Sequence, residues 1–268
     1  MKKIVINPIA GLCNRMRFIS SAIYVGYALD REIVINWNKA KNCAFEYEDL
    51  FEPVDLPNVY FCKNEVEKIL YRTDGPKTFK CFTLLRNILG YQQFFNYDYD
   101  REKIGIENII KPAKNVYIQS FFSVSRHYSL SKIFKPVSEV QSEIDKVIAK
   151  FNSNTIGVHI RRTDHKDAMA FSSISDYENM MTHEIKSCPS SNFYLATDDK
   201  EVKHLLMDKF RDKIICYSAP LTRESVEGMK AALVDLYCLS KTSKIYGSKG
   251  SSYSEIAAEL GNIDLLYR

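Results

Sequence analysis

Residues 155–164 read TIGVHIRRTD, an apolar run that ends in two adjacent arginines. The pattern predicts a strand over Thr155–Ile160, followed by a polar loop. Open α/β sheets bind their ligands outside the carboxyl ends of their strands, and the two arginines lie at such an end. This stretch therefore predicts both an α/β fold and a ligand site at the edge of its sheet.

Strand and helix patterns alternate on either side of this stretch. In the second half of the chain we expect helices over 137–151, 175–186, from 199, over 225–240 and from 252, and strands over 192–196, 213–217 and 243–246. Strands that alternate with helices of this length indicate a parallel sheet covered on both faces.

The first half begins in the same way, with expected strands over 3–6, 32–36 and 116–121 and a helix over 14–29. Between residues 38 and 114 the pattern is blurred by irregular aromatic-rich stretches such as YQQFFNYDYD. The sequence predicts two Rossmann-like domains, residues 1–135 and 136–268.

Arg161 and Arg162 offer forked donors that suit a diphosphate and stay charged at any working pH. Alternation along a strand places His159 and Arg161 on one face and Arg162 on the other. In the alternative interpretation, one arginine pairs with Asp164 and the other is solvated. The position at a strand end, after a histidine and before an aspartate, favours the ligand site.

Three further acidic residues, in two segments, are candidates. Asp198 and Asp199 end the segment FYLATDD, where Thr197 or Asp198 is a plausible helix cap and the carboxylates suit contact with ribose or acceptor, or orientation of the arginines. Asp235 lies in the apolar helical stretch AALVDLYCLS, where a carboxylate needs a partner. It suits the N1 and N2 edge of guanine, and a salt bridge to Lys203 or Lys230 is the alternative.

Two loops are candidate phosphate sites. Residues 247–254, GSKGSSYS, combine glycine, hydroxyl groups and a helix N-terminus, and Ser251, Ser252 and Tyr253 are the candidates there. Residues 8–17 join the first strand to the first helix, and Asn14 and Arg15 are candidates for reaching the donor phosphates. Each loop can also be a plain turn.

Composition excludes other classes. The formal net charge of +4, without a block of basic residues and aromatics, does not indicate a nucleic-acid partner. No segment has the length of a membrane span, and the seven scattered cysteines indicate a reducing compartment rather than a disulfide framework or a metal site. The sequence shows no Ser-His-Asp order, G-x-S-x-G motif or Walker loop.

Taken together, the segments GLCNRMR, GVHIRRTD, YLATDD and DLYCLS…GSSYSEIAAEL resemble the fucosyltransferases that use GDP-fucose. The likeness is greatest to the α1,6-type group, which includes glycan core and nodulation enzymes, and VYIQSFFSVSRHY resembles a segment of the α1,2-type enzymes. The clear match covers about residues 155–261 and the N-terminal loop.

The resemblance implies a GT-B fold, in which two Rossmann-like domains face a cleft, residues 1–135 on the acceptor side and residues 136–268 binding the nucleotide donor. It also implies inversion at the anomeric carbon and no metal. It implies that Arg161, with Arg162 beside it, holds the β-phosphate and that His159 and Asp235 recognise guanine. Ser251, Ser252 and Tyr253 then line the phosphate end. Asp198 and Asp199 match the family's paired acids, and Asp167 is the acid nearest to the position of the family's base.

The function expected from the sequence is transfer of fucose from GDP-fucose to a hydroxyl of a glycan acceptor, with no other cofactor. The same fold with another GDP-sugar is one alternative, and a non-catalytic nucleotide- or glycan-binding module is another. The expected location is cytoplasmic, free or peripheral to the inner membrane, in the synthesis of a surface polysaccharide.

Overall fold

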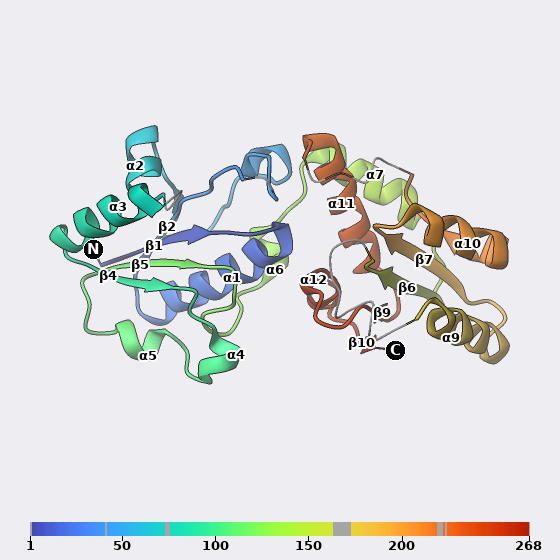
Figure 1. Ribbon diagram of the computed structural model, residues 1–268. Helices are drawn as coiled ribbons and strands as arrows, with labels where there is room; N and C mark the ends of the chain where they lie inside the picture. Colours follow the sequence, from blue (N-terminus) through green and yellow to red (C-terminus); the bar gives the residue numbers. More distant parts are fainter. Residues whose placement is uncertain are drawn as a thin grey trace. The chain divides into compact units, whose positions relative to one another are not determined.

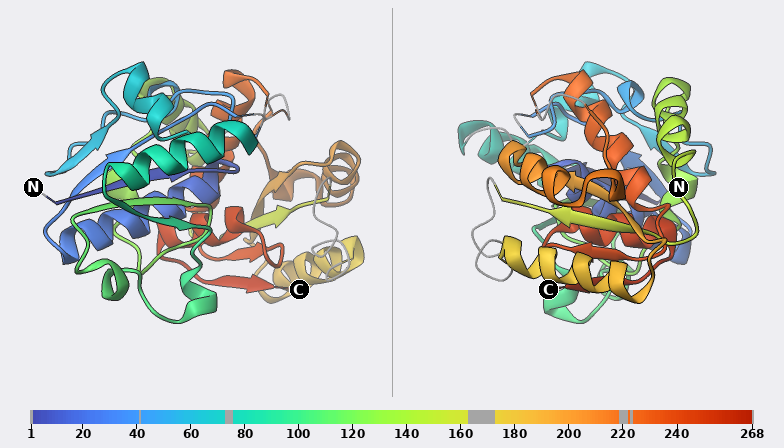
Figure 2. Two further views of the ribbon diagram at one scale, coloured as in Figure 1. Left: turned by 60° about the vertical axis from the view of Figure 1, so that its left-hand side comes forward. Right: turned by 90° about the vertical axis from the view of Figure 1, so that its right-hand side faces the viewer.

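The computed structural model describes residues 2–40, 42–72, 76–162, 173–218, 222 and 224–267. The chain divides into two compact units, Met1–Lys135 and Pro136–Arg268 (Figure 1). Each unit holds one five-stranded sheet in which every pair of neighbouring strands is parallel. Two further views show each sheet with helices beside it (Figure 2).

The N-terminal sheet has the strand order β3-β2-β1-β5-β4. Its strands are β1 (Lys3–Pro8), β2 (Glu32–Ile35), β3 (Val59–Phe61), β4 (Tyr91–Phe95) and β5 (Asn115–Ser120). The helices of this unit are α1 (Leu12–Ala28), α2 (Glu65–Leu70), α3 (Pro76–Ile88), α4 (Tyr99–Glu102), α5 (Glu107–Ile110) and α6 (Leu130–Ile133), with a 3-10 turn at Tyr47–Asp49.

Alternation along the strands gives this sheet two apolar faces. Helix α1 packs closely on one face, because Gly26 leaves room for the side chain of Ile33. On the other face Tyr71 packs against Tyr117, and the guanidinium of Arg86 in α3 lies 4.1 Å from the centre of the Tyr117 ring. Figure 1 shows α1 and α3 on opposite sides of the sheet.

The C-terminal sheet has the strand order β10-β9-β6-β7-β8. Its strands are β6 (Thr155–Ile160), β7 (Asn192–Thr197), β8 (Ile214–Ile215), β9 (Ile245–Gly247) and β10 (Leu265–Tyr267). The helices are α7 (Ser138–Ile148), α9 (Ile174–Ser187), α10 (Lys200–Phe210), α11 (Val226–Leu239) and α12 (Ser252–Gly261), with a 3-10 turn at Arg211–Lys213.

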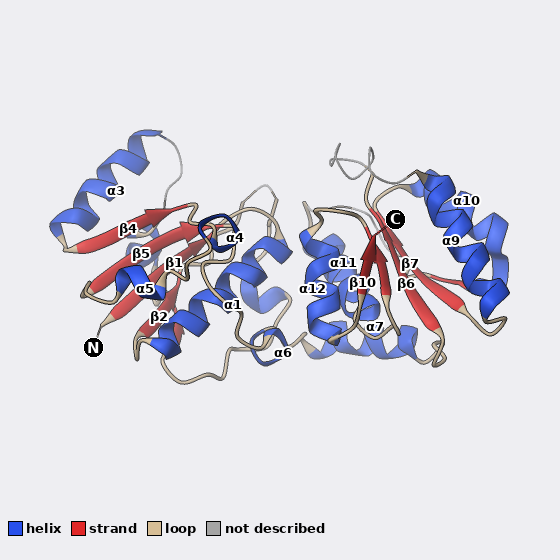
Figure 3. Cartoon of the chain, turned by 90° about the horizontal axis from the view of Figure 1, so that it is seen from below, coloured by secondary structure: helices blue, strands red, loops and turns tan. Residues whose placement is uncertain are grey.

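Strand β6 is buried along its whole length, and its two faces differ in chemistry. Ile156, Val158 and Ile160 join a core with Tyr177 of α9 and Leu206 of α10. The opposite face carries Gly157 and His159 and is covered by α11 and α12, with α7 packed on α11 (Figure 3). The polar histidine thus lies on the face that leads to α12.

The sequence prediction of an α/β chain with two parallel sheets is confirmed. The expected strand over 213–217 is wrong in extent, because only Ile214 and Ile215 pair with β7. The stretch YQQFFNYDYD begins with the edge strand β4, and the sequence alone shows no strand there because four of its five residues are partly or fully exposed. Strand β10 was not predicted.

No helix within the described residues combines the length and the hydropathy that a bilayer crossing requires.

Candidate functional site

The end of β6 is joined to the loop after β9 by one serine. Ser248 Oγ donates to the carbonyl of His159 over 3.1 Å and accepts from the backbone N–H of Arg161 over 3.0 Å. The hydroxyl of Tyr177 donates to the carbonyl of Gly247 over 3.2 Å. Because β6 and β9 are neighbours in the sheet, this contact fixes the backbone from which the two arginines project.

His159 is buried, with 7% exposure, and is held by the first turn of α12. Its Nδ1 lies 2.7 Å from Ser254 Oγ, and its ring lies 4.8 Å from the ring of Tyr253 at 33°. A side chain at Gly247 would bring its Cβ to 2.7 Å from Ser254, so the glycine is what allows α12 to begin this close to the sheet.

The N-terminus of α12 carries a buried hydroxyl that has no partner among the described residues. Ser251 is the N-cap residue, yet its side chain accepts no hydrogen bond from the helix. Its Oγ is buried and unpaired, and the residue is 0% exposed. The first N–H groups of a helix attract anions, and a hydroxyl without a partner adds a donor at the same point.

The two aspartates that follow β7 have different roles. Asp198 Oδ1 accepts from the backbone N–H of Arg162 over 2.8 Å, which supports the reading that it orients the arginine segment. Asp199 is the N-cap of α10 and accepts from the N–H groups of Glu201 and Val202 over 2.9 and 3.1 Å. The expectation that Thr197 or Asp198 caps this helix is therefore wrong.

Asp235 lies on α11 and accepts a hydrogen bond from the hydroxyl of Tyr194 in β7. Neither alternative ion pair forms within the described residues, since Lys230 binds Glu139 and Lys203 donates to the carbonyl of Tyr217. Burial raises the pKa of Asp235 to about 7, and the Tyr194 hydrogen bond and the charge of Lys203 offset this only in part.

Asp235 belongs to the same side of the sheet as His159. The hydroxyl of Tyr253, whose ring packs on His159, donates to the carbonyl of Ala232 over 2.5 Å. Ala232 lies one helical turn before Asp235 on α11. The described part of the chain gives the Oδ2 atom of Asp235 no hydrogen-bond partner.

Residues 8–17 span the junction between β1 and α1 within the N-terminal unit. The guanidinium of Arg15 donates to the carbonyls of Ala10 and Asn38 over 2.9 and 2.7 Å and lies 4.8 Å from the Trp37 ring centre. Arg15 is 1% exposed, and burial lowers its pKa. The structure thus places Arg15 inside the loop rather than at a ligand surface, whereas Asn14 is half-buried on the first turn of α1.

The structure brings together His159, Arg161, Arg162, Asp198 and the Ser251–Tyr253 segment at one edge of the C-terminal sheet. The predicted base Asp167, with Asp164 and His165, lies outside the described residues. In the described part of the chain, no three His, Cys, Asp or Glu side chains are grouped so as to hold a metal ion.

Ser248 and Ser254 lie in the loop that the sequence predicts, but their contacts with β6 were not predicted, and Tyr194, which binds Asp235, was not predicted as a site residue. Ser254 lies three residues after Ser251, so helical spacing was the signal that both lie on the side of α12 facing the sheet. Tyr194 carried no signal, because a tyrosine in an apolar strand is usually part of the core.

A matched pair of serine substitutions separates structure from binding. Ser254→Ala removes the partner of His159 and should lower the free energy of unfolding by about 1–3 kcal/mol. Ser251→Ala removes a hydroxyl without a partner and should not lower it. Urea unfolding of the two variants without ligand measures both values, and an equal loss in the two would contradict this description.

The chain has the fold of solved fucosyltransferases. It matches NodZ α-1,6-fucosyltransferase soaked with GDP-fucose with a TM-score of 0.67 and 18% identity, over 97% of this chain and 93% of that one. It matches a mutant of Arabidopsis thaliana FUT1 in complex with GDP with a TM-score of 0.67 and 15% identity, over 100% and 70%. The apo form of POFUT1 matches with a TM-score of 0.61 and 10% identity, over 99% and 97%.

No protein-family model and no curated protein sequence matches the chain. Identities of 10–18% establish the fold alone. The resemblance to GDP-fucose-dependent enzymes that the motifs indicate is confirmed at the level of architecture, as two Rossmann-like units of the GT-B type.

Proposed function

We propose that the chain is an inverting glycosyltransferase that moves fucose from GDP-fucose to a hydroxyl of a glycan acceptor. The proposal rests on the hydrogen bonds that hold the backbone at the end of β6. Ser248 holds the backbone of Arg161, and Asp198 holds that of Arg162. These two bonds fix the backbone from which the two guanidinium groups project, at a carboxyl edge of a parallel sheet, where nucleotides bind in such folds.

The diphosphate is proposed to lie between the arginines and the N-terminus of α12. Both arginines are half-buried, and burial from bulk water strengthens their attraction for an anion. The N–H groups and the unpartnered Ser251 hydroxyl supply further donors from the helix, with Ser252 beside them. During transfer, negative charge builds on the departing GDP, and these fixed donors stabilise it without rearranging.

The guanine base is proposed to bind on the side of His159, Tyr253 and Asp235. A carboxylate accepts two hydrogen bonds from N1–H and the N2 amino group of guanine. Asp235 has one oxygen engaged by Tyr194 and the other available. Adenine lacks both donors of that edge, so Asp235 selects the base as well as binding it.

The acceptor hydroxyl attacks the anomeric carbon from the side opposite to GDP, which inverts the configuration, and a carboxylate takes its proton. Asp167 remains the predicted base. The reaction as proposed requires no metal ion, and transfer should proceed unchanged in excess EDTA.

Three nucleotides test the base contact. GDP should raise the melting temperature most, IDP less because it lacks the N2 amino group, and ADP least, since stabilisation follows the ratio of ligand concentration to Kd. Equal shifts with GDP and ADP would contradict the assignment of Asp235. Ser251→Ala should reduce the shift with GDP while leaving the melting temperature without ligand unchanged or higher.

Two rival functions share this site. The proposed contacts to guanine and diphosphate do not distinguish one sugar from another, so transfer from another GDP-sugar is the second candidate. Calorimetry with GDP-fucose and with GDP-mannose distinguishes the two donors. A binding module without activity would bind GDP-fucose but release no GDP. GDP release from GDP-fucose that depends on a glycan acceptor, measured over a panel of glycans, establishes transfer.

A further inference from the structure

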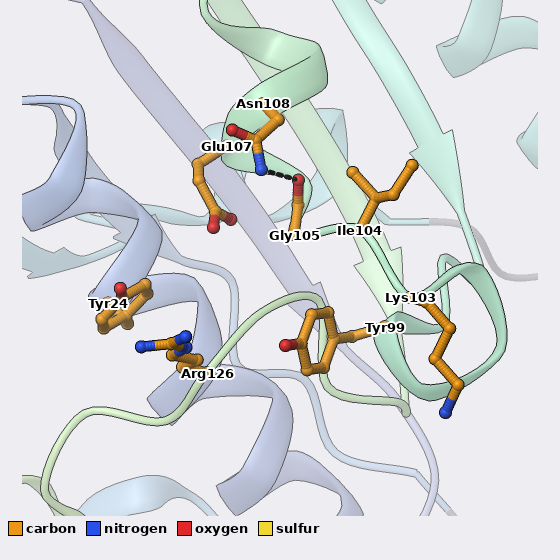
Figure 4. A pocket seen from close by; sticks show the side chains of 8 residues that line it. All are labelled: Tyr24, Tyr99, Lys103, Ile104, Gly105, Glu107, Asn108 and Arg126. Carbon is orange, nitrogen blue, oxygen red and sulfur yellow. Dashed lines mark hydrogen bonds between the residues drawn. The ribbon is translucent and has the colours of Figure 1, made fainter.

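A polar pocket opens within the N-terminal unit. It has a volume of about 410 Å³ and lies between α1, residues 99–108 and Arg126 (Figure 4). This volume is within the range of small-molecule sites, roughly 300–1,000 Å³. Three segments that are distant in the sequence therefore build one concave site.

Backbone hydrogen bonds fix the rim of the pocket before any ligand binds. The N–H of Tyr99 donates to the carbonyl of Ser123 over 2.8 Å, and the N–H of Ile106 donates to that of Val124 over 2.9 Å. These two bonds tie residues 99–106 to the loop after β5, from which Arg126 projects. The hydroxyl of Tyr97 donates to the carbonyl of Ile104 over 2.6 Å and holds the outer turn.

The carboxylate of Glu107 lies against Gly105, and one of its two oxygens has no hydrogen-bond partner among the described residues. A Cβ at Gly105 would lie 2.2 Å from Glu107 Oε1, so a glycine is needed for the carboxylate to take this position. Glu107 Oε2 is buried and has no hydrogen bond among the described residues. A buried carboxylate oxygen is costly without a donor, and a ligand in the pocket can supply one.

The lining of the pocket carries charges of both signs, which disfavours a simple ion as its ligand. Arg126 and Lys103 are cationic, Glu107 is anionic, and no ion pair joins them among the described residues. An anion would meet the Glu107 carboxylate, and a cation would meet Arg126 and Lys103. A neutral polyol avoids both, because each hydroxyl can donate to Glu107 and accept from Arg126 or Asn108.

The two tyrosines complete the match to a sugar. Tyr24 comes from α1 and Tyr99 from α4, and both lie in the pocket lining in Figure 4. An aromatic ring combines a broad apolar face with a polar tip, and a pyranose likewise presents C–H faces beside its hydroxyls. We infer that this pocket binds a neutral saccharide unit of the acceptor glycan, an inference that rests on the proposed function.

Saturation-transfer NMR on the full chain tests this binding without any donor. The probes are the neutral methyl glycosides of glucose, galactose, mannose and N-acetylglucosamine, with glucuronic acid and glucosamine as charged comparisons. At least one neutral glycoside should bind the wild type. Arg126→Ala and Glu107→Ala should each weaken it about tenfold or more, as expected for loss of a hydrogen bond to a charged group.

Arg101→Ala is the matched control, because Arg101 is an exposed arginine on α4 outside the pocket lining, and it should leave binding unchanged. Three results would overturn the inference: no neutral glycoside binds, only a charged sugar binds, or the pocket variants bind as well as the control. In the transfer assay, Arg126→Ala should raise the KM for the acceptor and leave kcat and the melting shift with GDP unchanged. A wild type that binds glycosides but shows no shift with GDP would refute the donor site and leave the pocket standing.

Discussion

Arg161→Ala is expected to reduce fucosyl transfer by at least a hundredfold while leaving the fold intact. The backbone N–H of Arg161, which Ser248 accepts, is kept in the variant, so the end of β6 stays clamped. What is lost is the forked cation that we propose to lie beside the departing diphosphate. Removal of one preorganised donor from a site of developing charge costs about 10²–10³ in kcat.

Two companion variants sharpen this result. Arg161→Lys keeps the charge but not the paired donors, and it should recover only part of the activity, because a single ammonium cannot bind two oxygens in the same geometry. Lys186→Ala removes an exposed cation from the last turn of α9 and should be as active as the wild type. Near-normal activity in Arg161→Ala, with circular dichroism equal to that of the wild type, would refute the site.

Asp235→Asn is expected to stabilise the fold and to weaken donor binding. The amide keeps an oxygen that accepts from Tyr194 but carries no buried charge. Between the ordinary pKa of an aspartate and about 7, the folded protein retains a proton on Asp235 that the unfolded chain has released. The free energy of unfolding of the wild type therefore falls as the pH rises through this range and then levels off.

The stability advantage of Asp235→Asn should accordingly grow from about pH 4 to about pH 7, reaching about 2–4 kcal/mol, and stay constant above. Urea unfolding at several pH values measures it. Asp208→Asn, which changes an exposed carboxylate on α10, should show no such growth. A constant difference for Asp235→Asn across this range would mean that Asp235 is not protonated in the folded state.

The affinity for the donor should rise with pH, whereas the free energy of unfolding falls. Guanine needs the ionised carboxylate, so the affinity of the wild type for GDP-fucose should rise with pH up to about 7 and then level off. Asp235→Asn should bind about 10–100-fold more weakly, and without this rise, because it loses hydrogen bonds to a charged group. Tyr194 and Cys238 do not titrate in this range, since burial raises the pKa of Tyr194 well above its ordinary value and that of Cys238 to about 12. The loss of the pH dependence in Asp235→Asn assigns the rise to Asp235 rather than to His159.

The sequence predicts the C-terminal sheet well, for a physical reason. Strands such as Thr155–Ile160 are buried on both faces, so their apolar runs are continuous and bounded by polar loops. The sequence predicts less of the N-terminal unit between residues 38 and 114, because short or partly exposed strands such as β3 and β4 carry little periodic pattern. Elements stabilised mainly by aromatic contacts, such as Tyr47 with Phe51 and Phe61, leave no strand or helix pattern.

Within the candidate site, chain position was predictable and side-chain contacts were not. The arginines, His159 and the serine loop were found because parallel strands end at a common edge. The sequence could not show that Ser248 binds the backbone of Arg161 and that Ser254 binds His159. These contacts depend on how closely the segment from Gly247 to the start of α12 packs against β6. The burial of Arg15 was equally hidden, since a loop arginine is usually solvated.

A crystal structure of the chain with GDP is the sharpest test of the proposed donor site. We expect the pyrophosphate within hydrogen-bonding distance of the Arg161 guanidinium and beside the N-terminus of α12, with the guanine edge on Asp235. A nucleotide bound elsewhere, or an Arg161 side chain that points into solvent while GDP is bound, would contradict it.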